Sequence, residues 1–568
     1  MERKTILKIV IWFLAVLILL AGILFSVGYL YYSKIIKSYL SEAVKKESKG
    51  LYQLEIGSLS FNVLSGNLTF ARFSLIPDTS FYRTHPHTDA MSPVLVKLNL
   101  DNIHIKRFRV MDALMHRRIS ISSILFSGTE VTVYRMKIQP KLNDEKHKGK
   151  TTSIPLPKGL NSIEIGELIT GNAKLDFIDC SGDSIIVNSF PTCNIIIQHI
   201  LVDSTHKGKT RLFNADDIRI KLGAFSLQMR NGMNKLSFGE IGFSTASSEL
   251  YMNDFHLEPL YSKAEYSRKL GFQTDWADVT VRKVALHRIN LRSLFLDGKI
   301  IAGLVEIDSA VLNDYRDKRV ALKPGYAPPM PHEILRNLKT YLRIDTVLLK
   351  SGRINYEEQT GNVPGTVFFD KVKGILTGLT NDSVLLKAGL VTELKGTLNL
   401  MGTGIIDATL RFHPGDFRNT FSFSARMGSF DLTEVNPMVS NLMGVKVVSG
   451  RVNKVTIPLV NANDDFATGI MLLYYNDLSI DMLDKKQTTW TKIKTGVIGW
   501  VIDDLIVSNE NPSKSGEMKL GIIQASRKKE LGFPNYLWRS VFSGLKSTVG
   551  LKSNKQKDST KKEEKKNV

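Results

Sequence analysis

Clusters of histidine, cysteine and carboxylate side chains would indicate metal or nucleophilic chemistry, and this sequence of 568 residues offers only one short example. His85, His87 and Asp89 alternate with other residues in a polar stretch. A metal site needs further ligands, so we interpret this stretch as a solvated loop. The sequence contains no Gly-rich phosphate loop, G-x-S-x-G elbow or H-E-x-x-H zinc motif. It therefore predicts a protein that is not an enzyme, with no catalytic residue, metal or cofactor.

The two cysteines, Cys180 and Cys193, leave two interpretations open. They are too few for a disulfide framework and lack the spacing of a structural zinc site. In an exported domain they predict either one disulfide, Cys180 with Cys193 across a hairpin, or two small buried thiols.

The composition is that of a protein that folds mostly in water. Hydrophobic residues make up 43% and charged residues 23%, which excludes collagen, wholesale disorder and a polytopic membrane protein. The net charge is +21, of which residues 1–50 carry +5 and residues 551–568 carry +4. The remaining excess is diffuse and suits an anionic membrane surface about as well as nucleic acid.

Residues 9–32 form an apolar run of 24 residues without a charge. As a helix this run would be about 36 Å long, enough to cross a hydrocarbon core of roughly 30 Å. Trp12 and Tyr29 lie towards its two ends, where interfacial aromatic residues are expected. We therefore predict a cytoplasmic N-terminus at 1–8, an uncleaved transmembrane helix at 9–32 and an amphipathic juxtamembrane helix at 33–50. Basic residues flank both sides of the run, so the positive-inside rule does not give its orientation. We expect the long domain that follows to be exported, because long domains cross the membrane largely regardless of their charge.

After residue 50 the pattern changes to apolar and polar alternation between glycines, which is typical of short antiparallel strands. The segment from Leu54 to Pro77 aligns without gaps on the segment from Leu236 to Pro259. The matches include Phe61 with Phe243 and Leu68 with Leu250. We predict two related β units, 51–231 and 232–410.

The rest of the chain is predicted to contain a further β region, an amphipathic helix and a tail. The β region covers 411–533 and the helix covers 534–550. The helix has one apolar stripe, made of Leu537, Val541, Leu545 and Val549. With this stripe it either packs across the end of the sheet or docks on a membrane or partner. Residues 551–568 are predicted to be a disordered basic tail.

The single N-terminal anchor and two stretches of sequence give the chain a resemblance to the AsmA-like superfamily. The first stretch is LEIGSLSFNVLSGNLTFARFSLIPD, which opens the first β unit. The second runs from FDLTEVNPMVSNLMGVKVVSGRVNKVTIPLV to GIMLLYYNDLSIDML, residues 430–483, and is the more specific of the two. The resemblance implies a protein anchored in the inner membrane of a Gram-negative envelope. Its periplasmic part would be an elongated, curved antiparallel sheet with an apolar groove.

The function that this resemblance implies is transport of phospholipids between the inner and outer membranes, with acyl chains shielded in the groove. The implied partners are phospholipids, the inner membrane through residues 9–32, and outer-membrane or envelope proteins, with no nucleic acid. The alternative is an assembly factor for outer-membrane proteins that carries no lipid and acts through strand pairing at an open edge.

The physical argument for a groove is that a sheet with one apolar face must cover it or present it to something apolar. Few helices are predicted, but a filled two-sheet sandwich would show the same alternation. The inward face is a hypothesis, and its candidate groove-lining residues are Leu59, Phe61, Leu68, Phe70, Ile241, Phe243, Leu250 and Met252.

Overall fold

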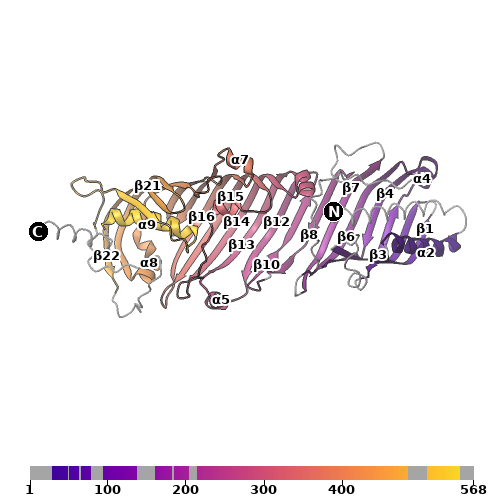
Figure 1. Cartoon of the computed structure of the whole chain (residues 1–568), viewed down its shortest axis with the longest axis horizontal. Helices are drawn as coiled ribbons and strands as arrows, with labels where there is room; N and C mark the ends of the chain where they lie inside the picture. Colours follow the sequence, from indigo (N-terminus) through magenta and orange to yellow (C-terminus); the bar gives the residue numbers. More distant parts are fainter. Residues whose placement is uncertain are drawn as a thin grey trace. The chain divides into compact units, whose positions relative to one another are not determined.

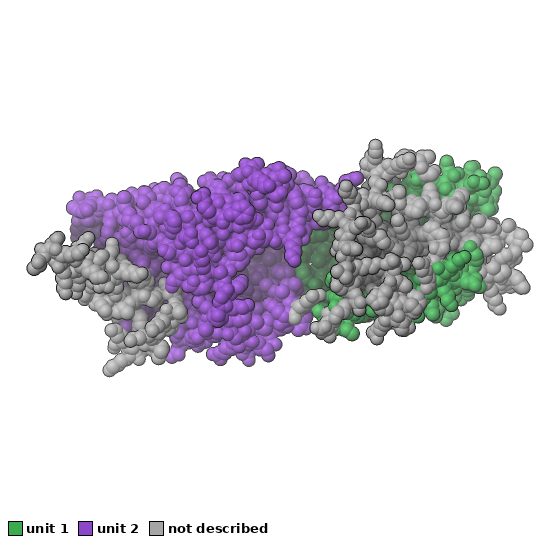
Figure 2. Space-filling view, viewed as in Figure 1, with its two compact units in different colours: residues 1–227, 237–253 green, residues 228–236, 254–568 purple. Residues whose placement is uncertain are grey.

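The structure is a computed structural model that describes residues 29–48, 50–62, 65–78, 94–136, 160–181, 185–203, 214–229, 231–483 and 508–550. The described residues fold mainly as β structure, in one large mixed sheet of 23 strands with a few short helices (Figure 1). This confirms the prediction of a mainly β fold with few short helices. The chain divides into two compact units (Figure 2). Unit 1 comprises residues 1–227 and 237–253, and unit 2 comprises 228–236 and 254–568.

Several of the predicted segments fall outside the described residues. These are the loop at His85 to Asp89, the tail at 551–568 and all but the last four residues of the predicted membrane span. The described chain starts with α2 (Tyr29–Glu47), which overlaps the predicted juxtamembrane helix. Of the helices in the described ranges, none has the length and hydropathy that crossing a bilayer requires.

Unit 1 is built from long strands joined mostly as antiparallel neighbours. Its strands are β1 (Tyr52–Asn62), β2 (Asn67–Pro77), β3 (Val94–Lys106), β4 (Arg118–Ser127), β5 (Glu130–Met136), β6 (Ser162–Cys180), β7 (Ile186–Asp203), β8 (Asp217–Leu222) and β11 (Glu240–Ser244), with helix α4 (Val110–His116). Three further strands, β9 (Phe225–Gln228), β10 (Asn234–Phe238) and β12 (Glu249–Pro259), contain the boundaries with unit 2.

Unit 2 continues with longer strands and most of the helices. The strands are β13 (Asp275–Ile289), β14 (Ile300–Asp317), β15 (Leu342–Gln359), β16 (Gly365–Thr380), β17 (Thr392–Leu400), β18 (Gly404–Phe412), β19 (Phe421–Met427), β20 (Phe430–Asp431), β21 (Val445–Ala462), β22 (Phe466–Met482) and β23 (Gly521–Ser526). The helices are α5 (Lys263–Leu270), η2 (Ser293–Asp297), α6 (Pro331–Arg336), α7 (Ser383–Lys387), η3 (Leu432–Val435), α8 (Asn436–Met443) and α9 (Phe533–Val549).

The sheet is not wholly antiparallel, which corrects the finer part of the predicted fold. β4 and β5 both pair in parallel with β6, and β14 pairs in parallel with β15. In each unit the parallel pair follows an antiparallel one and precedes another, β6 with β7 and β15 with β16. The same succession of pairings therefore occurs twice along the chain.

The sequence repeat coincides with equivalent strand registers. Phe61 pairs with Leu68 across β1 and β2, and Phe243 pairs with Leu250 across β11 and β12. A backbone feature recurs as well, because Arg72 and Asp254, which occupy the same position in the repeat, both have a positive φ, of 54° and 50°. These matches support a duplicated element, while the domain boundaries at 231 and 410 stay a prediction.

Unit 1 has a filled hydrophobic core beneath α2. Leu40 of α2 is 1% exposed and packs with side chains from β1 to β4 and β6. The Ser41 hydroxyl donates a hydrogen bond of 2.7 Å to the Leu54 carbonyl, which fixes α2 along β1. Val110 and Ala113 of α4 pack on the same core from the side.

The second core lies in unit 2, where α9 packs against β22 and β23. The predicted apolar stripe of α9, Leu537, Val541, Leu545 and Val549, contacts this core together with Phe533 and Tyr536 of the same helix. The helix thus takes the first of its two predicted positions, packed on the sheet.

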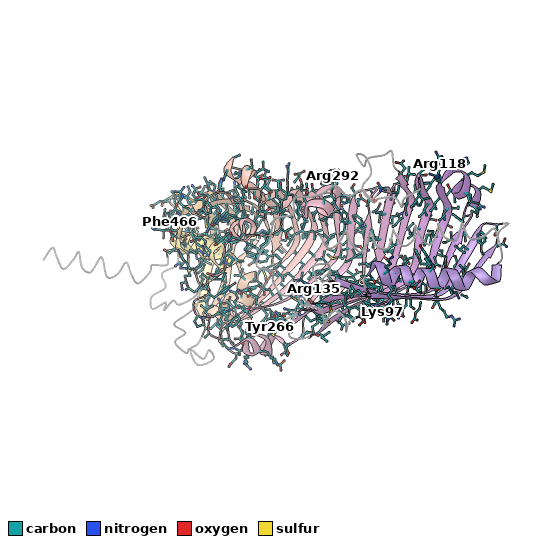
Figure 3. All side chains as sticks on the ribbon, turned by 45° about the vertical axis from the view of Figure 1, so that its right-hand side comes forward. Lys97, Arg118, Arg135, Tyr266, Arg292 and Phe466 are labelled. Atoms are coloured by element: carbon teal, nitrogen blue, oxygen red, sulfur yellow. The ribbon has the colours of Figure 1, made fainter. Side chains whose placement is uncertain are left out.

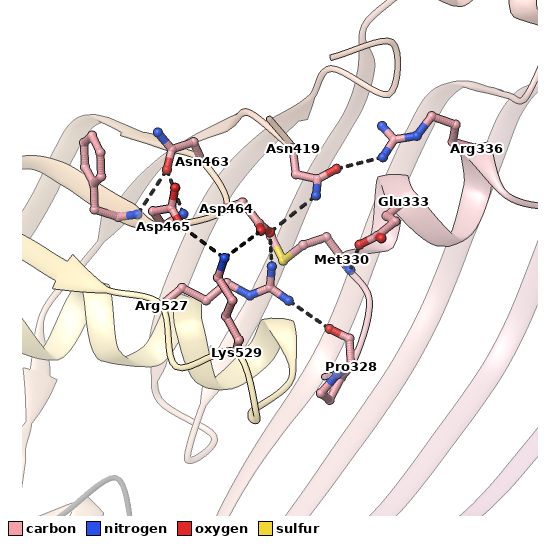
Figure 4. A network of polar contacts seen from close by, with 11 residues as sticks. Pro328, Met330, Glu333, Arg336, Asn419, Asn463, Asp464, Asp465, Arg527 and Lys529 are labelled. Atoms are coloured by element: carbon pink, nitrogen blue, oxygen red, sulfur yellow. Dashed lines mark hydrogen bonds and ion pairs between the residues drawn. The ribbon is translucent and has the colours of Figure 1, made fainter. Parts of the chain in front are cut away.

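A polar network ties the segments around this core together (Figure 4). Arg527, whose side chain is 5% exposed, pairs with Asp464 in the turn between β21 and β22. It also donates a hydrogen bond of 2.8 Å to the carbonyl of Pro328, just before α6. Asn419 adds a contact of 3.3 Å to Asp464. One buried guanidinium therefore holds segments that are far apart in the sequence.

The structure contradicts a Cys180–Cys193 disulfide. Both cysteines are free, and Cys193 lies opposite Ala173 in the pairing of β6 with β7. Cys180 lies beyond the last pair of that ladder, Asp179 with Ile186. The two are thus about eight positions apart along the hairpin, roughly 25 Å at the rise of a strand, whereas a disulfide needs Cα atoms within about 7 Å.

Candidate functional site

The candidate site is one face of the sheet, and strand register decides which side chains share it. Residues directly opposite each other in neighbouring strands point to the same face, so a chain of such pairs defines a row. Row 1 crosses nine strands of unit 1 and consists of Leu59, Phe70, Ile103, Phe126, Thr170, Ile195, Ile220, Phe243 and Leu250. All but one of its members are apolar.

Two further rows flank row 1 on the same face. Row 2 consists of Phe61, Leu68, Ile105, Ile124, Leu168, Ile197 and Ile218. Row 3 consists of Ala173, Cys193, Leu222, Ile241 and Met252. The three rows include all eight residues that the sequence analysis selected, so the structure brings the candidate set onto a single face.

Burial divides the eight residues into two groups. Leu68 and Phe70 are 2% and 1% exposed and belong to the filled core under α2. Leu59 and Phe61 pack against that core. These four therefore stabilise one end of unit 1 and are not part of an open surface.

The other four, Ile241, Phe243, Leu250 and Met252, are half-buried and belong to neither core cluster. Their row neighbours on β7 and β8 are half-buried in the same way, except the buried Cys193. The helices that pack on unit 1 strands lie on β1 and β4, and among the described residues no helix lies over β7 and β8 (Figure 1).

The opposite face of β8 is charged. Arg219 and Lys221 of β8 alternate with the apolar residues of the rows and are exposed. Lys221 forms an ion pair of 2.8 Å with Glu240, and this contact lowers the pKa of the Glu240 carboxyl. Solvated ion pairs of this kind mark the wet face of a sheet.

Unit 2 carries an equivalent row that the sequence analysis did not select. Row 4 crosses eight strands and consists of Leu286, Val305, Val347, Leu376, Leu394, Leu410, Phe423 and Val460. Val460 and Phe423 are buried in the second core, at 0% and 6% exposure, whereas Leu286, Val347 and Leu376 are half-buried. The alternation of apolar and polar residues, as in Val279-Thr280-Val281, indicates a strand in the sequence. It does not show which residues of neighbouring strands lie opposite each other, so the shared face could not be assigned without the register.

A polar cluster lies in unit 2 towards the ends of β14 and β15. Arg316 contacts both carboxylate oxygens of Asp275, at 2.5 and 2.6 Å. Lys318 pairs with Glu358 at 2.5 Å, and the two side chains are 9% and 7% exposed. The Tyr356 hydroxyl donates a hydrogen bond of 2.8 Å to Glu358. The ends of these strands therefore carry a cluster of paired charges.

Asp314 lies within this polar cluster, opposite Tyr356. Burial and the neighbouring charge of Asp275 raise the pKa of the Asp314 carboxyl to about 7. One of its buried oxygen atoms has no hydrogen-bond partner among the described residues. The cluster contains no arrangement of nucleophile and base, and the described residues hold no group of three metal-ligating side chains.

Comparison with known proteins adds no family assignment. No protein-family model matches the chain, and no curated protein matches it either.

Proposed function

We propose that this chain is a membrane-anchored envelope protein that shields phospholipid acyl chains on the apolar face of its sheet. The observation that carries the proposal is the continuity of the half-buried apolar rows beyond the filled cores, in unit 1 over β7, β8 and β11 and in unit 2 over β13 to β17. Figure 2 shows a recess in the visible face of unit 2. On this proposal the sheet is curved and elongated, and its apolar face lines a groove.

The energetics favour hydrocarbon as the occupant of such a face. Each methylene group removed from water contributes about 0.8 kcal/mol, so a single acyl chain would supply several kcal/mol without any specific contact. Row 1 offers isoleucine, phenylalanine and leucine side chains on consecutive strands. Headgroups would stay in water beyond the apolar rows.

The resemblance to the AsmA-like superfamily supports the same proposal from the sequence. It places the anchor, residues 9–32, in the inner membrane and the body in the periplasm, and it makes transport of phospholipid between the inner and outer membranes the function. The apolar run of 24 residues and the basic charge around it suit this position.

Native mass spectrometry of the detergent-solubilised full chain tests the proposal. We expect phospholipid to copurify with the protein, and we expect Phe243→Asp to reduce the bound lipid because a carboxylate in row 1 opposes hydrocarbon. Asn194→Asp is the matched control, since it places the same charge on the opposite face and keeps the acceptor for the Asn172 amide. A wild-type chain without lipid, or equal lipid in both variants, would contradict the proposal.

A second candidate function is assembly of envelope proteins through strand pairing. Among the described strands, β23 pairs only with β22, so its other edge has no strand partner there. Ile522 of β23 and its partner Ile470 are 51% and 41% exposed. An exposed edge with apolar side chains can accept a strand from another protein. A lipid-free chain that captures β-barrel substrates would favour this alternative.

A further inference from the structure

Helix α4 of unit 1 presents its apolar side chains to solvent. Met111, Leu114 and Met115 are 64%, 51% and 69% exposed. They make up half of the exposed large apolar side chains in the described residues of unit 1, although the helix has only seven residues. Val110 and Ala113 face the core instead, so the helix is held firmly while its outer face is open.

Basic residues flank these three side chains in the sequence. Residues 106–118 contain five lysines and arginines and a single acid, Asp112. The five are exposed, and they are Lys106, Arg107, Arg109, Arg117 and Arg118. Figure 3 labels Arg118 at the margin of the ribbon, where β4 begins. The nearest partner of Arg109 is Asp112, at 3.8 Å, which leaves the local charge strongly positive.

The position of α4 is fixed relative to the start of α2. The Lys37 ammonium donates to the Gly57 carbonyl and the Ser41 hydroxyl to the Leu54 carbonyl, so α2 runs antiparallel to β1. Its first residues therefore lie towards the turn that joins β1 and β2. The Phe108 amide donates a hydrogen bond of 2.8 Å to the Gly66 carbonyl in that turn. The segment leading into α4 and the beginning of α2 thus lie at the same end of unit 1.

We propose that α4 and its flanking arginines form a second membrane contact, which inserts Met111, Leu114 and Met115 among the headgroups of an anionic phospholipid surface. Exposed apolar side chains flanked by cations are the pattern of an interfacial membrane-binding helix. The arginines pair with lipid phosphates, and the three side chains leave water. The contact holds unit 1 against the membrane in which residues 9–32 are anchored.

This inference rests on the anchoring in the proposed function but not on lipid carriage. The full chain, with Cys180→Ser and Cys193→Ala, is labelled with the environment-sensitive fluorophore NBD at Met115→Cys. It is then reconstituted in nanodiscs of phosphatidylcholine alone or mixed with phosphatidylglycerol. Coelution of protein with the discs reports anchoring separately, and lipid in the groove does not affect the emission at residue 115.

We expect the emission of the label at residue 115 to shift to shorter wavelength in the anionic discs and to become less accessible to iodide in the water. The same label at Val187→Cys, a site that is 58% exposed on β7, is expected to stay unshifted. Arg117→Glu with Arg118→Glu should reverse most of the shift at residue 115. An unshifted label at residue 115, an equal shift at both sites, or a shift that survives the two charge reversals would overturn the proposal.

Discussion

His332 and Asp314 show how the fold of unit 2 moves two protonation equilibria in opposite directions. His332 is 2% exposed, its ring centroid lies 5.5 Å from that of Phe412, and burial lowers its pKa to about 4. Asp314 instead has its pKa raised, because its charged form is buried beside Asp275. Each group therefore adds a pH dependence of stability with its own sign.

His332 should make the protein less stable in mild acid. The unfolded state binds a proton near pH 6.5 and the folded state only near pH 4, so the stability contributed by this group is full above 6.5 and falls as the pH drops. Between pH 7 and pH 5 the expected loss in unfolding free energy is about 2 kcal/mol. Urea unfolding of wild type and His332→Leu at both pH values measures this loss. An identical pH dependence in the two proteins would rule out the assignment.

Asp314→Asn should behave in the opposite way. The folded state keeps its proton up to a pH of about 7, whereas the unfolded state releases it near 3.8, so the stability from this group is lost as the pH rises between these values. The amide cannot ionise, and we expect the unfolding free energy of the variant to exceed that of wild type by about 4 kcal/mol at pH 8.5 and to match it at pH 3.5. Thermal unfolding at both pH values checks this. A variant that is less stable at pH 8.5 would mean that Arg316 holds the ionised carboxylate.

At the scale of residues, the sequence could predict which side chains share a face of the sheet but not which other side chains they contact. The eight candidate residues lie on one face because alternation is local and follows from a period of two. That Leu68 is core while Leu250 is half-buried depends on α2, which covers only one of the two equivalent positions. The Asp314 cluster joins side chains from β13, β14 and β15, and no local spacing indicates it.

At the scale of elements, α9 is held by packing and by a buried cation. Arg527 follows β23 directly, and its guanidinium contacts Asp464 and the carbonyl of Pro328. Without this guanidinium, Asp464 would keep only Lys529 at 3.5 Å and Asn419 at 3.3 Å, and the Pro328 carbonyl would lose a donor, which is costly. The network therefore fixes the connection between β23 and α9 against the rest of the second core.

Arg527→Met should destabilise the protein by about 3 kcal/mol, because Asp464 and the Pro328 carbonyl lose their buried donor. Arg418→Met is the matched control: its side chain is 82% exposed and pairs with Asp416 at 3.5 Å. That control should change the unfolding free energy by less than about 0.5 kcal/mol. Equal effects of the two substitutions in chemical denaturation would contradict the role given to Arg527.

The repeated β element was the part of the fold that the sequence predicted best. The alignment of the two segments matched the strand ends as well as the registers, since β2 maps on β12 from Asn67–Pro77 to Glu249–Pro259. The parallel pairs were not predicted, because pairing direction depends on where a connection leads and not on the alternation within a strand. The disulfide interpretation was wrong for a similar reason, since spacing alone does not give register.

At the scale of the whole molecule, the proposed lipid transport requires that one face of the sheet meets hydrocarbon. Ile220 and Arg219 are neighbours on β8 that point to opposite faces, Ile220 within row 1 and Arg219 beside Asp217 at 3.0 Å. Position 220 of β8 therefore lies on the apolar face and position 219 on the charged face. A probe at each position therefore distinguishes the two faces within one element.

Photocrosslinking of these two positions in cells tests the central claim most directly. A benzoylphenylalanine residue is placed at Ile220 or at Arg219 of the full chain, and crosslinks to radiolabelled phospholipid are counted after ultraviolet irradiation. The account predicts strong lipid crosslinking from position 220 and little from position 219. Lipid crosslinks that are absent from position 220, or equal at the two positions, would contradict it.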